Sequence, residues 1–241
     1  MKLYLFAGAG AALLAACSYQ ASAQADFTGA ETKSYDLPEF TGLDVATGIE
    51  VNFTTGGAQS VVAENVNGAW DKLEVKVKGD TLHLQRKKTS GFGYNRNKEK
   101  FRVTVSARAL SSLETSSGSS VKGSGLSGDN VLVDTSSGSY VSVTDISAGK
   151  LTADTSSGST VKLNGTCTSI SADTSSGSSL RAKDLVCASA DLEASSGSSL
   201  SVTATDRVNA DASSGSSINV SGNPQVQTVD KSSGASVNIR G

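Results

Sequence analysis

The chain contains few aromatic residues and little histidine, proline or cysteine. Its 241 residues include one tryptophan, one histidine, two prolines and three cysteines, and aromatic residues make up 5% of the total. After Phe101 the single aromatic residue is Tyr140, so Val, Leu, Ile, Ala, Ser and Thr must fill the second half of the molecule. A β-sandwich or an α/β domain usually needs bulkier side chains between its layers. The composition therefore favours a narrow solenoid with a thin core.

A strong net charge is also absent. The formal charge is -2 at pH 7, which argues against nucleic acid as a partner. The single histidine, His83, lies in an alternating segment, where we predict a surface position. Cys167 and Cys187 have no histidine near them in the sequence and are too few for a metal site. We expect neither a metal nor an organic cofactor.

The chain instead contains seven copies of a short motif: an acidic residue, one spacer, and Ser-Ser-Gly followed by Ser or Ala. The glycines of successive copies lie 18 to 20 residues apart. Such a period predicts stacked coils that bury their apolar faces only against their neighbours. We predict an all-β fold, a parallel β-helix or solenoid with coils of ~19–20 residues, regular from about residue 113 and preceded by an irregular β-rich portion. The acidic residues of the motif are Glu114, Asp134, Asp154, Asp173, Glu193, Asp211 and Asp230.

Apolar and small residues alternate along each repeat. Side chains alternate across a strand, so one parity should point into the solenoid and the other out of it. In the third repeat, Asp154 and Lys162 have the outward parity, and the alternation predicts a strand that continues through the Ser-Ser-Gly block. Inward serines should bond between coils or to backbone carbonyls. The predicted inward residues of this repeat are Leu151, Ala153, Thr155, Ser157, Ser159, Val161 and Leu163.

The repeated acids predict a ladder of carboxylates, because parallel strands lie ~4.8 Å apart. Two such charges repel by only ~0.9 kcal/mol in water, so an exposed ladder is tolerable. One interpretation is a row of calcium sites, with Asp134, Asp154 and Asp173 as candidates. We favour the alternative, in which each acid caps a turn and solubilises its face, because calcium needs several oxygens that converge on one point.

Cys167 and Cys187 each precede the next motif glycine by ten residues. They should therefore occupy equivalent places on adjacent coils, at a separation that a disulfide accepts. An exported chain reaches an oxidising compartment, where such a bond can form. Stacked free thiols are the alternative, because parallel neighbours do not always aim their sulfurs at each other.

The N-terminus predicts export. Lys2 precedes an apolar run over residues 3–16, which is too short to span a bilayer and has the size of a secretory signal. Leu-Ala-Ala-Cys at the end of this run looks like the lipobox of bacterial lipoproteins and would make Cys17 the lipidated first residue. The alternative is ordinary cleavage after Ala23. We assign residues 1–23 to the signal, 24–35 to a polar tether and 36–241 to one domain.

One segment differs from its surroundings in charge. Residues 86–102 contain seven basic residues, interleaved with Phe92 and Tyr94, against the single acid Glu99. This mixture suits an anionic ligand such as a phosphorylated glycolipid, an acidic polysaccharide or a nucleic acid. The simpler interpretation, which we favour, is a solvated hairpin tip. The basic residues are Arg86, Lys87, Lys88, Arg96, Lys98, Lys100 and Arg102.

Several strand and turn patterns resemble those of a known family. They are Phe-Thr-Gly-Leu-Asp-Val at 40–45, Ile-Glu-Val-Asn-Phe at 49–53, Thr-Leu-His-Leu at 81–84, Phe-Arg-Val-Thr-Val at 101–105 and Leu-Glu-Thr-Ser-Ser-Gly at 113–118. From Phe40 to Gly241 the chain resembles the auto-transporter adhesin head GIN domain family of bacterial exported proteins. The resemblance implies right-handed parallel β-helical coils and a location in the cell envelope. It brings no active-site residues.

The function that we favour is an adhesin-like, non-enzymatic protein of the cell envelope. Its partner would be an envelope glycan, a glycolipid or another surface protein. A lipid anchor on Cys17 would hold it at the outer membrane, facing the periplasm or the cell surface; without the anchor it would be periplasmic or secreted. The alternatives are a purely structural envelope protein and a carbohydrate-active β-helix enzyme of the polysaccharide lyase or hydrolase type. Such an enzyme needs a non-repeating cluster of carboxylates and bases, whereas this repeat spreads its acids evenly.

Overall fold

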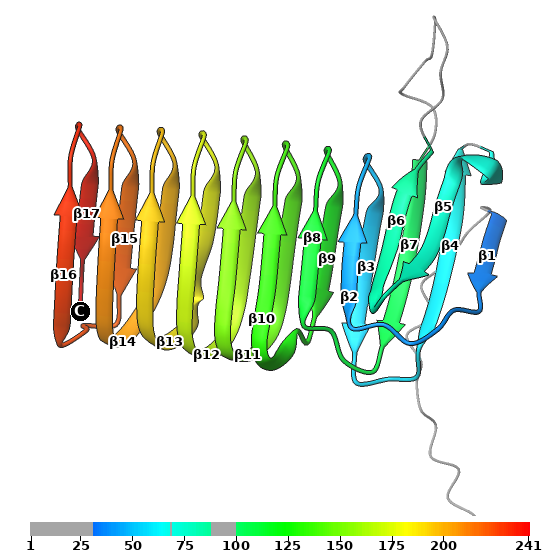
Figure 1. The fold of residues 1–241 in the computed structure, drawn as a ribbon, viewed down its shortest axis with the longest axis horizontal. Coiled ribbons are helices and arrows are strands. Elements are labelled where there is room, and N and C mark those ends of the chain that lie inside the picture. Colours follow the sequence, from blue (N-terminus) through cyan, green and yellow to red (C-terminus); the bar gives the residue numbers. More distant parts are fainter. Residues whose placement is uncertain (1–30, 68, 88–99) are drawn as a thin grey trace, which may run out of the picture.

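The computed structural model describes residues 31–67, 69–87 and 100–241, which form the predicted parallel β-solenoid with an irregular N-terminal portion. Its coils stack along the long axis of the molecule (Figure 1). The predicted signal and Cys17 lie outside the described residues. The elements are β1 (Glu31–Tyr35), β2 (Gly42–Val45), β3 (Glu50–Thr55), β4 (Ser60–Asn67), the 3₁₀ helix η1 (Trp70–Lys72), β5 (Leu73–Lys78), β6 (Thr81–Arg86), β7 (Lys100–Ala107), β8 (Ser112–Thr115), β9 (Ser120–Ser124), β10 (Ser127–Thr135), β11 (Tyr140–Thr155), β12 (Thr160–Thr174), β13 (Ser179–Ala194), β14 (Ser199–Ala212), β15 (Ser217–Ser221), β16 (Val226–Lys231) and β17 (Ser236–Ile239).

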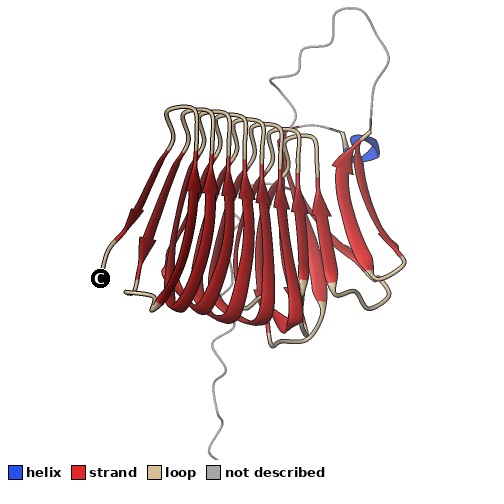
Figure 2. Ribbon diagram, turned by 60° about the vertical axis from the view of Figure 1, so that its left-hand side comes forward, coloured by secondary structure: helices blue, strands red, loops and turns tan. Residues whose placement is uncertain are grey.

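Each coil contributes a strand to each of two sheets, and a tight turn joins the two strands along one edge of the molecule (Figure 2). The first sheet contains β5, β6, β2, β8, β10, the C-terminal halves of β11 to β14, and β16. The second contains β1, β4, β7, β3, β9, the N-terminal halves of β11 to β14, β15 and β17. The pairs between coils are parallel, and Leu151 lies opposite its repeat equivalents Val131 and Ile170. A register shift between Val143 and Ile146 marks the bend of β11 from one sheet to the other.

The Ser-Ser-Gly block is a turn, which corrects the prediction of a continuous strand. In the third repeat Ser157 and Gly158 have φ angles of 55° and 72°, and the Ser159 N–H donates to the Ser156 carbonyl over 3.2 Å. Two successive positive φ angles are those of a type I′ turn, in which glycine fits the second position without strain. Ser157 is therefore exposed at the tip, whereas Thr155 and Ser159 on either side point inward.

Outside the turn, the predicted inward residues form the core. Leu151 and Val161 are fully buried. Some inward serines bond to backbone carbonyls of the preceding coil, as predicted: Ser178 Oγ donates to the Thr155 carbonyl over 2.8 Å, and Ser216 Oγ donates to the Ala194 carbonyl over 2.7 Å. Ser139 Oγ, in contrast, finds no partner among the described residues. Four inward threonines also have hydroxyls that find no partner among the described residues. These are Thr115, Thr135, Thr155 and Thr174.

The stack begins in an order that differs from the order of the chain. β2 and β3 meet at a turn with positive φ at Thr47 and Gly48, and they pair with β8 and β9 as a further coil of the same kind. β6 and β7 come later in the chain but pair on the outer side of β2 and β3. The antiparallel strands β1, β4 and β5 close this end. Residues 31–35, which we predicted as the end of the tether, form β1 and belong to the folded domain.

The other end of the stack carries polar side chains at core positions. In the last coil Gln227 and Lys231 occupy the register positions of the buried residues Val208 and Ala212. Gln227 Nε2 donates to the Pro224 carbonyl over 2.9 Å. A charge at an inward position discourages another strand from adding to an exposed edge. These two polar side chains protect only part of this end, because Val229, at another inward position of the same coil, is apolar and 41% exposed.

The in/out assignment can be tested with two adjacent residues. Val161 is fully buried and Lys162 is exposed. Val161→Asp should lower the free energy of unfolding by at least ~3 kcal/mol, because it buries an unpaired charge. Lys162→Asp should change it by less than ~0.5 kcal/mol. Urea unfolding followed by circular dichroism measures both, and equal effects would contradict the assignment.

Candidate functional site

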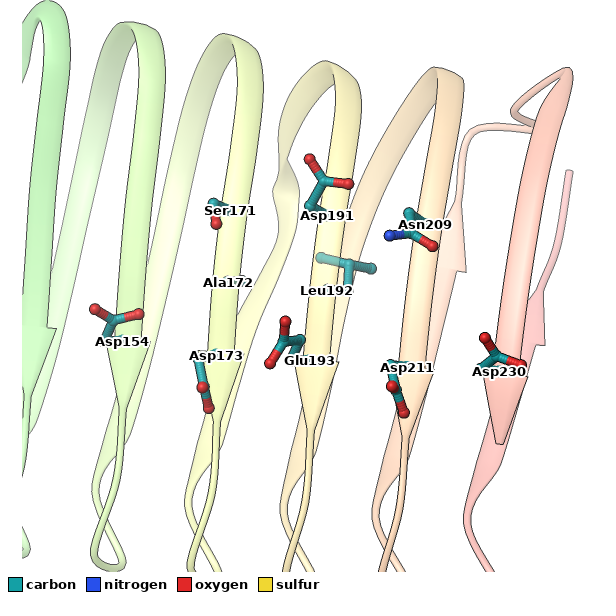
Figure 3. Close-up of a pocket in the computed structure, with 10 residues that line it drawn as sticks. All are labelled: Asp154, Ser171, Ala172, Asp173, Asp191, Leu192, Glu193, Asn209, Asp211 and Asp230. Carbon is teal, nitrogen blue, oxygen red and sulfur yellow. The ribbon is translucent and has the colours of Figure 1, made fainter. Parts of the chain in front are cut away.

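The predicted acidic ladder runs along the outer surface of the first sheet. The carboxylate residues lie in direct register from coil to coil, as shown by the pairs of Asp154 with Asp134 and with Asp173. Part of the ladder lines a shallow hollow of about 380 Å³ (Figure 3). Asp191 adds a carboxylate beside Glu193, one outward position further from the turn. The hollow is lined by Asp154, Ser171, Ala172, Asp173, Asp191, Leu192, Glu193, Asn209, Asp211 and Asp230.

Like charges and partial burial act on the middle of this ladder. Partial burial raises the pKa of Asp134 above its ordinary value. The pKa of Asp154 is raised first by burial and then by the neighbouring carboxylates of Asp134 and Asp173. At Asp154, therefore, the carboxylates on the adjacent coils add to the effect of burial in opposing ionisation.

The ladder extends beyond the seven motifs to Asp44 and His83. Asp44 pairs with Glu114 on one side and with His83 on the other, and His83 Nδ1 lies 2.7 Å from Asp44 Oδ2. The motif search missed Asp44 because Ala46 and Thr47 replace the two serines. The spacing from the acid to Gly48 is nevertheless that of the motif, and this spacing was the signal that could have found it.

The ladder does not gather its carboxylates around a point. Among residues 31–67, 69–87 and 100–241, no group of three or more His, Cys, Asp and Glu side chains has the arrangement of a metal site. The calcium candidates Asp134, Asp154 and Asp173 are successive rungs of one row. The single histidine of the chain lies at the opposite end of the row from the hollow. This arrangement is that of a solvated surface whose negative charges are spread along a row.

The described residues of the basic segment 86–102 divide into those whose side chains bond to other parts of the fold and those whose side chains are exposed. Arg86 Nε donates to the Thr47 carbonyl, so this side chain fastens β6 to the adjacent turn. Arg102 forms ion pairs with Glu64 over 3.0 Å and with Glu50 over 3.4 Å.

Only part of the candidate patch in this segment lies within the described residues. Lys87 and Lys100 are the described residues on either side of residues 88–99. Both are exposed, at the edge of the molecule where the turns stack. Lys88, Arg96 and Lys98 lie outside the described residues. Arg86 and Arg102 thus have roles in folding that the composition of the segment did not indicate.

Cys167 and Cys187 are joined by a disulfide. They are register partners on β12 and β13, with their Cα atoms 4.5 Å apart. The bond therefore links adjacent coils at equivalent positions. It cross-links two coils in the middle of the stack. Near this position the strands bend from one sheet to the other, and the register of their pairing shifts.

The parallel coils, with equivalent residues in register and a disulfide between two of them, define a single β-solenoid. Among the described residues, the acidic side chains of its first sheet are spread along a row. A family model described as "Putative auto-transporter adhesin, head GIN domain" matches residues 39–224. The chain belongs to this adhesin-like family, which confirms the resemblance found in the sequence. Family membership makes it an adhesin-like protein and suggests an exported or surface protein.

Solved structures share the fold at low sequence identity. A "putative adhesin" from Bacteroides fragilis has a TM-score of 0.78 at 18% identity and covers 88% of this chain and 97% of its own. A "putative adhesin" from Parabacteroides merdae has a TM-score of 0.66 at 14% identity, with 87% and 95% covered. A "putative lipid binding protein" from Parabacteroides distasonis has a TM-score of 0.61 at 17% identity, with 88% and 97% covered. These likenesses show the fold.

No curated protein matches the chain. Within the described residues, no helix combines the length and apolarity needed to cross a membrane.

The repulsion in the ladder predicts a pH-dependent stability. Because the pKa of Asp154 is raised in the folded state, its ionisation opposes folding. The protonated carboxyl of Asp154 therefore favours the folded state. This contribution to the free energy of unfolding is fully present below the pKa of the unfolded chain, near 3.8, and is lost as the pH rises through the pKa of the folded state. Asp154→Asn should therefore raise the free energy of unfolding by ~1 kcal/mol at pH 7 and leave it unchanged below pH ~3. Asp36→Asn, outside the ladder, is the control, and a destabilised Asp154→Asn at pH 7 would contradict this explanation.

The disulfide predicts a stability that depends on its formation. It closes a sequence separation of 20 residues, so its loss should lower the free energy of unfolding by about 3 kcal/mol. The variant Cys167→Ser/Cys187→Ser should show this loss in urea unfolding without a change in its circular dichroism. A reducing agent should have the same effect on the wild type and none on the variant. Equal stabilities of variant and wild type would contradict the stapling role.

Proposed function

We propose that this chain is a non-enzymatic, adhesin-like protein of the cell envelope that binds an anionic envelope glycan or glycolipid. The observation that carries the proposal is the membership of an adhesin-described family over residues 39–224, on a fold whose acids are spread along a row. A catalytic site of the lyase or hydrolase type needs carboxylates placed at a defined separation around one bond. The carboxylates of the row repeat from coil to coil. Asp191 beside Glu193 is the departure that lines the hollow, and both of these side chains come from the same strand, β13.

The candidate contact is the edge of the molecule at which the basic segment begins and ends. Lys87 and Lys100 are exposed there, next to the stacked turns, and Lys88, Arg96 and Lys98 add three charges in the sequence between them. Clustered basic residues raise the local concentration of anionic ligands and speed their association. Arg86 and Arg102 support this edge through their bonds to Thr47, Glu50 and Glu64.

The proposed location follows from the N-terminal sequence. Lipidation of Cys17 would anchor the chain at the outer membrane, with residues 18–30 as the tether to β1. Cleavage after Ala23 would instead release it to the periplasm or the exterior. Mass spectrometry of the exported protein separates the two, because only the first route adds acyl chains to residue 17.

The binding proposal is tested by glycan and glycolipid arrays with a variant that leaves the fold intact. Lys87, Lys88, Arg96, Lys98 and Lys100 are changed to Gln, while Arg86 and Arg102 are kept. The control changes five other basic residues to Gln: Lys33, Lys78, Lys150, Arg207 and Arg240. We expect wild type and control to bind acidic glycans or glycolipids and the segment variant to lose at least about tenfold in affinity, as expected for several lost ionic contacts.

Two results would contradict the proposal. Equal binding by the segment variant and the control would exclude this edge as the contact. No binding of the wild type to any anionic glycan or glycolipid, with or without calcium, would favour a purely structural role in the envelope.

A further inference from the structure

The outer surface of the second sheet carries a cluster of cations that the repeat does not require. Lys122, Lys162 and Arg181 occupy one outward row, four residues after the motif glycine of their coils. Lys162 and Arg181 are direct register partners, and Ser142 separates Lys162 from Lys122. In the coils that follow, the same row holds Ser201, Asn219 and Asn238. The cluster therefore spans only part of the solenoid.

The cations line a second hollow, of about 410 Å³, on this face. Lys162, Arg181 and Lys183 contribute three positive charges to its lining, and Asp184 contributes one negative charge. The rest of the lining is neutral: Ser142, Val143, Thr144, Leu163 and Asn164. The hollow thus has an excess of two positive charges, in a molecule whose net charge is negative.

These cations are exposed and form no ion pair with another described residue. Lys162 and Arg181 lie side by side on adjacent parallel strands, where like charges destabilise the pairing. Serine or asparagine fills this row elsewhere without that repulsion. A bound anion would remove the repulsion, since guanidinium and ammonium groups form charge-assisted hydrogen bonds with carboxylates, sulfates and phosphates.

An aromatic ring lies beside the cluster. Tyr140 is partly exposed on the same face, and Lys162 Nζ lies 5.8 Å from the centre of its ring. Its register partners are Ser120 and Thr160, and Ser or Thr fills the same row in the coils beyond. Tyr140 is thus a second departure from the repeat at the same place. A ring with a polar hydroxyl offers an apolar surface and a hydrogen bond together, as a sugar ring requires.

We infer that this face, with Tyr140, Lys162, Arg181 and Lys183 at its centre and Lys122 beside them, binds a linear anionic polysaccharide that lies across adjacent strands. The inference rests on the proposed function and adds to it a site separate from the 86–102 segment. The carboxylate or sulfate groups contact the cations on successive coils, and a sugar ring packs on Tyr140. Binding of a second copy through its acidic ladder is disfavoured, because the ladder runs the length of the solenoid whereas the cations occupy a few coils.

The test uses the purified protein with polygalacturonate and heparin as probes, neutral dextran as the negative control, and vesicles with anionic phospholipid as the lipid arm. The test variant is Lys162→Gln/Arg181→Gln. The matched control is Lys150→Gln/Arg207→Gln, which removes one lysine and one arginine from the exposed surface of the first sheet. Thermal unfolding establishes that all variants are folded.

We expect the test variant to bind the polyanions at least about tenfold more weakly than wild type, Tyr140→Ala to bind about threefold more weakly, and the control to stay within about twofold of wild type. Binding should also weaken with rising salt.

Other results would overturn the inference in distinguishable ways. Full binding by the test variant, with loss in the 86–102 variant, would exclude this face and leave the proposed function intact. Binding to vesicles but not to the soluble polyanions would replace the polysaccharide with a lipid headgroup. Sedimentation that shows self-association of wild type, abolished in the test variant, would make a second copy the partner. Failure of wild type to bind any of these probes would overturn the inference together with the proposed anionic ligand.

Discussion

The backbone hydrogen bonds between successive coils determine the register of the whole solenoid. They hold each residue next to its equivalent one repeat earlier and one repeat later, as with Val141 and Val161 or Asp134 and Asp154. A residue type that recurs at one position of the repeat therefore forms a row of side chains along the molecule. The core needs no aromatic residues beyond Phe101, because rows of Val, Leu, Ile and Ala fill the narrow space between the two sheets. The same register turns one acidic residue in a motif into a ladder.

The outer surfaces of the two sheets differ in how regularly they follow the repeat. On the first sheet the acidic row of the repeat is kept, and its carboxylates are tolerated because they are exposed or only partly buried and each coil contributes one of them to the row. On the second sheet the repeat is broken at Tyr140, Lys162 and Arg181. In a scaffold in which equivalent positions normally match, a local departure toward larger and charged side chains is where selection for binding would act. The acids lie four residues before the motif glycine and the cations four after it, so the turn separates the two charged surfaces.

The period of the repeat was sufficient to predict the solenoid, the coil length, the acidic row and the equivalence of Cys167 and Cys187, because register follows directly from the period. Alternation alone failed at Ser157, since it cannot detect a turn that reverses the chain within two residues of positive φ. It also gave no means to predict that β6 and β7 pair outside β2 and β3. That order depends on long-range pairing of strands whose sequences do not repeat. The structural roles of Arg86 and Arg102 likewise depend on neighbours distant in the sequence.

Acetylation footprinting of lysines by mass spectrometry tests most directly whether the break in the repeat, and not the ladder, is the binding surface. The wild-type protein supplies its own control. Lys122 and Lys162 lie on the second sheet and Lys183 lines the same hollow as Lys162, whereas Lys150 lies on the first sheet. With polygalacturonate present, acetylation of the first three lysines should slow while that of Lys150 is unchanged. Equal rates at all four positions, or protection of Lys150 alone, would contradict the account.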